Sequence, residues 1–188
     1  MSDSVVLDAE RLRLTALAAD ALDAWIEGDA RALLDLTGAR FDLPVDTPPL
    51  FGEDLPGFRD RMVECPDELG WWVWLVTRKD NGLAVGVCGL AGLPDEEGVA
   101  DLGYAVYPRW EGRGYATEST NRLVSWVLEQ SGARCVRATV PLWNKASVAV
   151  ARKLGMTETA RGQHPEVGEV AMYELTELTF ESTTRDPY

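Results

Sequence analysis

One segment in the middle of the chain runs from a strand pattern into a glycine-rich turn and then directly into a helix pattern. Residues 99–107 are expected to form a strand that ends at Pro108, and residues 115–129 have an amphipathic helix pattern. Between them, Gly112 and Gly114 lack Cβ atoms, so successive backbone N–H groups can converge on one point. The helix start adds unpaired N–H groups and the positive end of its dipole. The segment therefore predicts an anion site of the kind that binds phosphate.

Other phosphate-binding patterns do not match this turn. The chain has no GxxxxGK[ST] sequence, and Thr117 stands where a dinucleotide fingerprint has its third glycine. A turn that only joins strand to helix is the alternative interpretation. Residues 109–161 carry 9 lysines and arginines against 4 acids, whereas the whole chain has a net charge of −13. A basic island in an acidic protein favours a local anionic ligand, and the overall charge makes nucleic acid a poor partner.

The remaining pattern predicts one α+β domain over residues 1–188, without repeats or linkers. Asn81-Gly82 is a strong hairpin signal, and residues 41–57, with four prolines, predict a loop. The aromatic run at 71–76 indicates a strand buried on both faces rather than a binding platform. Further strands are expected at residues 7–14, 71–77, 83–91, 135–140, 157–160 and 169–178, and helices at 18–27, 30–36, 55–64 and 145–154.

The sequence also predicts a cytoplasmic setting. Cys65, Cys88 and Cys135 form no CxxC pair, which suits a reducing compartment and argues against a metal site; the last two are expected to be small buried strand residues. The start of the chain has no signal-peptide pattern. No apolar run approaches the roughly 18 residues that a membrane span needs, so no membrane partner is expected.

A second segment, PLWNKASVAVARKLGM at residues 141–156, completes a family pattern. Together the two segments resemble the GCN5-related N-acetyltransferase (GNAT) superfamily, above all its ribosomal-protein-alanine-acetyltransferase-like (RimJ/RimL-type) branch. The resemblance covers residues 70–180 well and residues 1–70 only in general layout. The matching residues are Leu102-Gly103-Tyr104, Pro108, Gly112 to Glu118, Asn144, Ala146-Ser147 and Lys153-Leu154-Gly155.

The resemblance implies a mixed, V-splayed β-sheet flanked by helices, with acetyl-CoA as co-substrate in a cleft between the strands that end at Tyr107 and Val140. Residues 1–70 would form a variable acceptor-side part and residues 71–180 the acyl-CoA-binding core. The implied cofactor-binding residues are Ala105, Val106 and Tyr107 for the pantetheine arm, Gly112, Arg113, Gly114, Tyr115 and Ala116 for the pyrophosphate, and Thr117, Asn144 and Lys153.

The same resemblance suggests catalytic roles. An alkyl ammonium has a pKa near 10, so some group must take its proton. Asp101 is the base candidate; its alternative role is that of an exposed acid at the strand edge, and a water chain would then carry the proton. Relatives often have a tyrosine as donor to the leaving thiolate where this chain has Ala151, so Ser147 is the remaining candidate donor. Its alternative role is to cap the helix start. Asn144 would contact pantetheine or cap the helix, and Tyr104 would line the acceptor cleft.

The acceptor is expected to be a small-molecule amine or a protein N-terminus. Residues 1–70 carry 16 acids and 6 arginines, which favours a cationic acceptor, with Asp42, Asp46, Glu53 and Asp54 as contacts. Glu111 is expected to point outward, and the single histidine, His164, to be a loop residue at the surface. A homodimer is compatible with this pattern. The competing interpretation is a non-catalytic acyl-CoA-binding module on the same fold.

Overall fold

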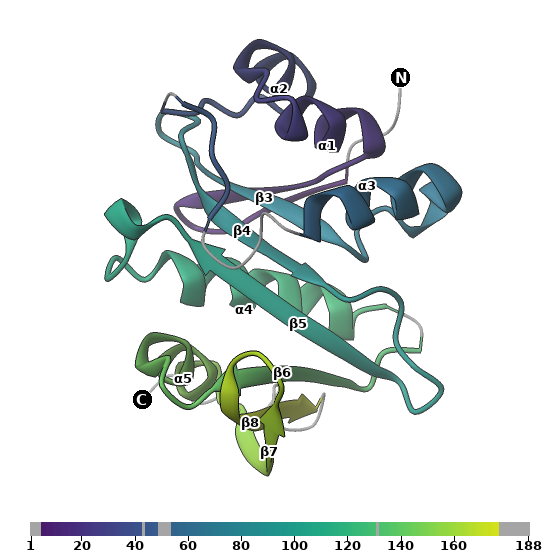
Figure 1. The fold of residues 1–188 in the computed structure, drawn as a ribbon, viewed down its shortest axis with the longest axis vertical. Helices are drawn as coiled ribbons and strands as arrows, with labels where there is room; N and C mark the ends of the chain where they lie inside the picture. The colour runs from purple at the N-terminus through teal and green to yellow at the C-terminus, as the bar shows by residue number, and fades with distance from the viewer. Residues whose placement is uncertain (1–4, 43, 49–53, 131, 177–188) are drawn as a thin grey trace. The chain divides into compact units, whose positions relative to one another are not determined.

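The computed structural model describes residues 5–42, 44–48, 54–130 and 132–176. In these residues the strands form one eight-stranded mixed sheet in the order β1-β2-β3-β4-β5-β6-β8-β7, which confirms the α+β class (Figure 1). The strands are β1 (Val6–Asp8), β2 (Leu12–Ala16), β3 (Val73–Arg78), β4 (Ala84–Leu90), β5 (Val99–Val106), β6 (Cys135–Pro141), β7 (Thr157–His164) and β8 (Gly168–Thr176). The helices are α1 (Ala19–Ile26), α2 (Ala30–Thr37), α3 (Leu55–Glu64), α4 (Tyr115–Leu128) and α5 (Lys145–Lys153).

The chain divides into two compact units that share β5 and α4. The first unit consists of Met1–Leu90 and Tyr104–Leu123, and the second of Ala91–Gly103 and Val124–Tyr188. This division differs from the boundary near residue 70 between an acceptor part and a cofactor part, and that functional boundary stays a prediction.

The core of the first unit lies between helices α1 to α3 and the strands β3 and β4. Leu22 and Trp25 of α1, Leu33 of α2 and Met62 of α3 are buried together with Leu75 of β3. Strand residues alternate between two faces, so Trp74 is buried on the opposite side of β3, and its exposed fraction is 0%. The prediction that the aromatic run is a doubly buried strand is therefore confirmed for residues 73–76.

The hairpin that joins β3 to β4 has the predicted turn. Gly82 has a φ of 70°, which a residue with a Cβ adopts only at a cost, and the side chain of Asn81 accepts a hydrogen bond from the N–H of Leu83 at 3.0 Å. Cys88 of β4 is fully buried, as expected, and burial raises the pKa of its thiol.

The second unit is built on β6, which pairs in parallel with the start of β5 and antiparallel with β8. The β5–β6 ladder joins Val99–Asp101 to Cys135–Arg137, and Cys135 is buried as expected. Helix α5 packs against β6. Its end agrees with the sequence, because Gly155 follows it with a φ of 77° in the left-handed region that closes helices.

Two predictions about strands were wrong. Residues 7–14 form a hairpin of β1 and β2 instead of one strand, closed by a hydrogen bond of 2.9 Å from the N–H of Ala9 to the carbonyl of Leu12. That turn contains no glycine, proline or asparagine that would reveal it. Strand β7 continues to His164 instead of ending at residue 160, because pairing with β8 outweighs the weak strand preference of Gly162 and His164.

Candidate active site

The glycine turn lies in the first unit, where β5 meets β4 and then leads into α4. The N–H of Tyr107 donates to the carbonyl of Val85 at 3.0 Å, which holds the end of β5 against β4. After a short 3-10 turn at Pro108–Trp110, Gly112 and Gly114 adopt φ values of 71° and 80°. Both lie in the left-handed region, which explains why the turn carries glycine at these two positions.

The backbone N–H groups of this turn have no acceptor among the residues that the structure describes. Across the part of the chain that the structure describes, no N–H of residues 112–117 donates to a protein atom, and the first helical bond of α4 runs from Glu118 to the carbonyl of Gly114 at 3.0 Å. The side chains of Asp29 and Asn144 cap helices α2 and α5, whereas α1 and α3 also begin without a side-chain cap, so the glycines and Arg113 are what distinguish the start of α4. An array of free N–H groups at a helix start is a binding site for an anion.

The open side of the turn has room for such a ligand. Gly112, Arg113 and Gly114 are exposed, and a Cβ atom added to Gly112 would meet no atom within 4 Å. The guanidinium of Arg113 lies 5.1 Å from the centroid of the Trp110 ring, which orients the cation beside the turn. Glu111 is exposed, as expected. The residues at the turn therefore fit the diphosphate of a CoA molecule.

The predicted pantetheine-binding residues behave differently from one another. Tyr104, Ala105 and Val106 are half-buried at the end of β5. Tyr107 is 3% exposed, and its hydroxyl donates to the carbonyl of Asp46 at 2.7 Å, while burial raises the pKa of this hydroxyl. The N–H of Tyr107 is bonded to Val85, so its N–H and its hydroxyl both have partners within the first unit.

Asp101 lies in the second unit and is paired with Arg137 across the parallel ladder of β5 and β6. Its carboxylate oxygens accept hydrogen bonds from Nε and Nη2 of Arg137 at 2.7 and 2.9 Å. This bidentate pair raises the pKa of the Arg137 guanidinium. The turn at residues 94–98, before β5, is capped by Asp95, whose side chain accepts from the N–H of Val99 at 2.9 Å.

The second predicted cluster stands at the start of α5. The side chain of Asn144 accepts a hydrogen bond from the N–H of Ser147 at 3.0 Å, so Asn144 is the N-cap of this helix. Ser147 is half-buried one turn into the helix, and Lys153 is exposed at its end. Ala151 is fully buried. Trp143, just before the cap, is 59% exposed and donates to the carbonyl of Val167 at 3.1 Å, and no motif indicated it.

The predicted site residues are thus divided between the two units. Tyr104, Ala105, Val106, Tyr107, Gly112, Arg113, Gly114, Tyr115, Ala116 and Thr117 belong to the first unit, and Asp101, Asn144, Ser147 and Lys153 to the second. Among the described residues, no group of three or more histidines, cysteines or acids is arranged to hold a metal ion, and no helix has the length and apolar character of a bilayer span.

The predicted acceptor contacts have different surroundings. Asp42 forms an ion pair with Arg109 at 2.9 Å, and the carbonyl of Asp46 accepts from Tyr107 and from Trp25. Asp54 is exposed, and Glu53 lies outside the described residues.

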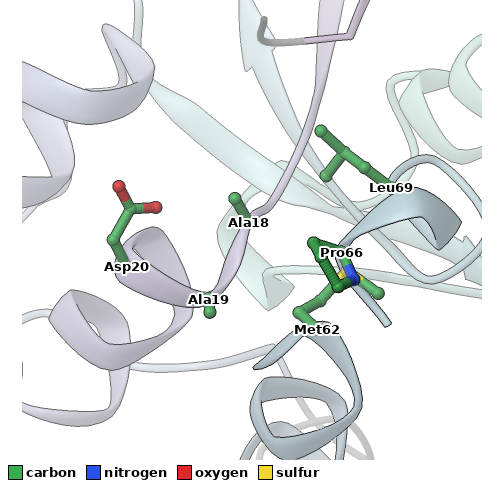
Figure 2. Close-up of a pocket in the computed structure, with 6 residues that line it drawn as sticks. All are labelled: Ala18, Ala19, Asp20, Met62, Pro66 and Leu69. Carbon is green, nitrogen blue, oxygen red and sulfur yellow. The ribbon is translucent and has the colours of Figure 1, made fainter. Parts of the chain in front are cut away.

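The first unit also holds a shallow pocket that sequence reasoning did not find. It has a volume of about 270 Å³ and lies between the start of α1 and the end of α3. Figure 2 shows Asp20 at one end and Met62 and Pro66 at the other. Asp20 is the one ionisable side chain among the lining residues, which are Ala18, Ala19, Asp20, Met62, Pro66 and Leu69.

Comparison with known proteins identifies the family of the chain. The family model of the acetyltransferase (GNAT) domain matches residues 11–157. An uncharacterized N-acetyltransferase of Bacillus subtilis, YjdG, is 30% identical over 152 residues, which are 80% of this chain and 89% of the relative.

Among solved structures, the ribosomal L7/L12 acetyltransferase RimL in complex with coenzyme A has a TM-score of 0.67 at 17% identity and covers 92% of this chain and 98% of its own. The spermidine N-acetyltransferase SpeG of Vibrio cholerae has a TM-score of 0.66 at 13% identity and covers 93% and 98%. These likenesses show a shared fold. The chain belongs to the GNAT family of acetyltransferases.

Proposed function

We propose that this protein transfers an acetyl group from acetyl-CoA to an amine by direct attack in a ternary complex. One observation carries the proposal: the turn at residues 112–117 presents backbone N–H groups without protein acceptors, next to two left-handed glycines and the Arg113 cation. Such an array is complementary to the diphosphate of CoA. Family membership supports the reaction type.

The chemistry needs a neutral amine, an acceptor for its proton and a donor for the leaving thiolate. Ser147 is the hydroxyl that we assign to the thiolate. Asp101 is the base that the sequence offers, but taking up a proton would weaken the charge-assisted hydrogen bonds to Arg137. The ion pair therefore favours a structural role for Asp101, and a water chain along the strand backbone would carry the proton.

The acceptor that we propose is a cationic amine. The two similar structures are a ribosomal L7/L12 acetyltransferase and a spermidine N-acetyltransferase, and both kinds of substrate present amines. The acidic first 70 residues favour cations in this chain. The absence of CxxC pairs supports a cytoplasmic location.

The test is a thiol-release assay with acetyl-CoA and a panel of amines that includes spermidine, an alanine-terminated peptide and an aminoglycoside. Amine-dependent release of CoA supports the transferase. Calorimetric binding of CoA without release by any amine would instead support a non-catalytic binding module. No binding of CoA would remove both interpretations.

A further inference from the structure

Arg11, in the turn between β1 and β2, contacts the glycine turn although more than 100 residues separate them. Its backbone N–H donates to Oε1 of Glu118 at 2.6 Å, and its Nε and Nη2 each lie 2.7 Å from Oε2 of the same carboxylate. Its Nη1 donates to the carbonyl of Arg113 at 3.1 Å. Its guanidinium carbon lies 5.0 Å from the centroid of the Tyr115 ring. All of these residues belong to the first unit.

These contacts amount to more than a surface ion pair. Exposed pairs between two flexible side chains contribute little. Here the Glu118 side chain is only 15% exposed and receives both a backbone and a side-chain bond from Arg11. The planar guanidinium is then held in one orientation between a carboxylate and a carbonyl. Arg11 therefore connects the first turn of α4 to the residue between the two glycines.

The bond to the Arg113 carbonyl has a consequence for the neighbouring N–H. The carbonyl of Arg113 and the N–H of Gly114 belong to one planar trans peptide and point in opposite directions. A donor that fixes the carbonyl on one side therefore fixes the N–H on the other side. It also polarises the peptide, which strengthens that N–H as a donor. The N–H of Gly114 is one of the groups that have no acceptor in the described part of the chain.

We infer that Arg11 is a positioning residue for the anion-binding turn, acting through the Arg113 carbonyl and Glu118. The inference rests on the proposed function and deepens it. Because Glu118 neutralises the Arg11 charge, Arg11 orients the phosphate donors instead of serving as a phosphate ligand itself. The inference also assigns Arg11, which belongs to residues 1–70, to the binding of acetyl-CoA. The sequence had predicted that residues 1–70 serve the acceptor.

The test compares CoA with pantetheine, which has the same arm and thiol but no diphosphate, in calorimetric titrations of three variants. Arg11→Ala should raise the Kd of CoA about tenfold, as expected for one lost charge-assisted hydrogen bond, and leave the affinity for pantetheine unchanged. Arg11→Lys keeps the charge but cannot reach both Glu118 and the Arg113 carbonyl. Its Kd for CoA should therefore lie between those of the wild type and Arg11→Ala. Arg13→Ala is the matched control, because Arg13 is on the same hairpin and pairs only with Asp8 at 3.0 Å among the ion pairs of the described residues.

The outcomes separate the inference from the function on which it rests. If wild-type protein binds CoA and Arg11→Ala binds it equally well, Arg11 does not position the turn. If Arg11→Ala weakens CoA and pantetheine equally, its effect is general destabilisation, and the inference is also wrong. Thermal melting of each variant shows whether it is folded. If Arg11→Ala is unfolded, the Kd of CoA is compared between the wild type and Arg11→Lys instead. If the wild type binds no CoA, the proposed function fails together with the inference.

Discussion

Asp101 and Arg137 face each other across the parallel ladder of β5 and β6 and form a two-point ion pair at 2.7 and 2.9 Å. If this pair is structural, Asp101→Asn and Arg137→Gln should each lower the free energy of unfolding by about 1 kcal/mol or less, because both groups are partly exposed. Neither should change the pH dependence of kcat. Thermal melts and pH–rate profiles measure both effects.

The two variants also test the opposite assignment. Loss of a general base lowers turnover by about 10²–10⁴-fold. If Asp101→Asn loses turnover on that scale while Arg137→Gln keeps it, Asp101 is the base and the water route is wrong. The acceptor KM should stay similar in either case, because proton removal affects the transition state more than binding.

Gly112 offers a matched comparison for the anion-binding turn, because Gly28 has the same φ of 71° and neither has an atom within 4 Å of an added Cβ. Alanine at either position should therefore cost a similar backbone strain of about 1 kcal/mol. Only Gly112→Ala places its methyl group where the diphosphate is proposed to lie, so it should weaken CoA binding about tenfold or more. Calorimetry that shows equal affinity for both variants would remove the diphosphate from this turn.

How far the sequence alone reaches can be seen from particular residues. The glycine turn and the Asn81-Gly82 hairpin were predictable, because glycine, proline and asparagine act on the backbone at their own positions. The hairpin of β1 and β2 was not, since its turn carries no such residue. The pairs Asp101–Arg137 and Arg11–Glu118 depend on strand order and register across long separations, and no local pattern encodes them. Sequence motifs located the glycine turn but not the Arg11 side chain that contacts it.

Asn144 and Ser147 lie at the same helix start but are expected to have different roles, a structural one for Asn144 and a catalytic one for Ser147. Because Asn144 caps α5, Asn144→Ala should cost about 1 kcal/mol of stability, whereas Asn144→Asp keeps the cap and most of the stability. If Ser147 donates to the thiolate, Ser147→Ala should lower kcat with acetyl-CoA at temperatures where the variant is fully folded. Stopped-flow thiol release and thermal melts check both. Unchanged turnover in Ser147→Ala would assign the leaving group to another donor.

Glu68 should make the first unit sensitive to acid. The Arg61 guanidinium beside it, at 2.9 Å, lowers the pKa of its carboxyl, and Trp72 donates to the same oxygen at 2.9 Å. A lowered pKa in the folded state gives stability that is present above the ordinary value of 4.5 and is lost as pH falls through the lower, folded-state value. Glu68→Gln should therefore be less stable than the wild type at pH 7, and the difference should shrink below pH 4.5. Denaturant melts across this pH range measure it; a difference that is constant with pH would contradict the argument.

The charge of the first 70 residues predicts how acceptors are ranked. For matched amines that add a charge of +1, 0 or −1 away from the reacting nitrogen, kcat/KM should be highest for the cation at low salt. The advantage should fade as the screening length shortens below about 10 Å above 0.1 M salt. Asp20 is the one carboxylate among the described residues that line the pocket in Figure 2. If the acceptor enters this pocket, Asp20→Asn should lower kcat/KM for the cation only. Asp35→Asn is the matched control, because Asp35 pairs with Arg31 on the exposed side of α2 at 2.9 Å. A neutral or anionic acceptor with the higher kcat/KM at low salt would contradict the electrostatic argument. If Asp20→Asn and Asp35→Asn have equal effects, Asp20 makes no specific contribution, and the net charge of residues 1–70 alone attracts the cation.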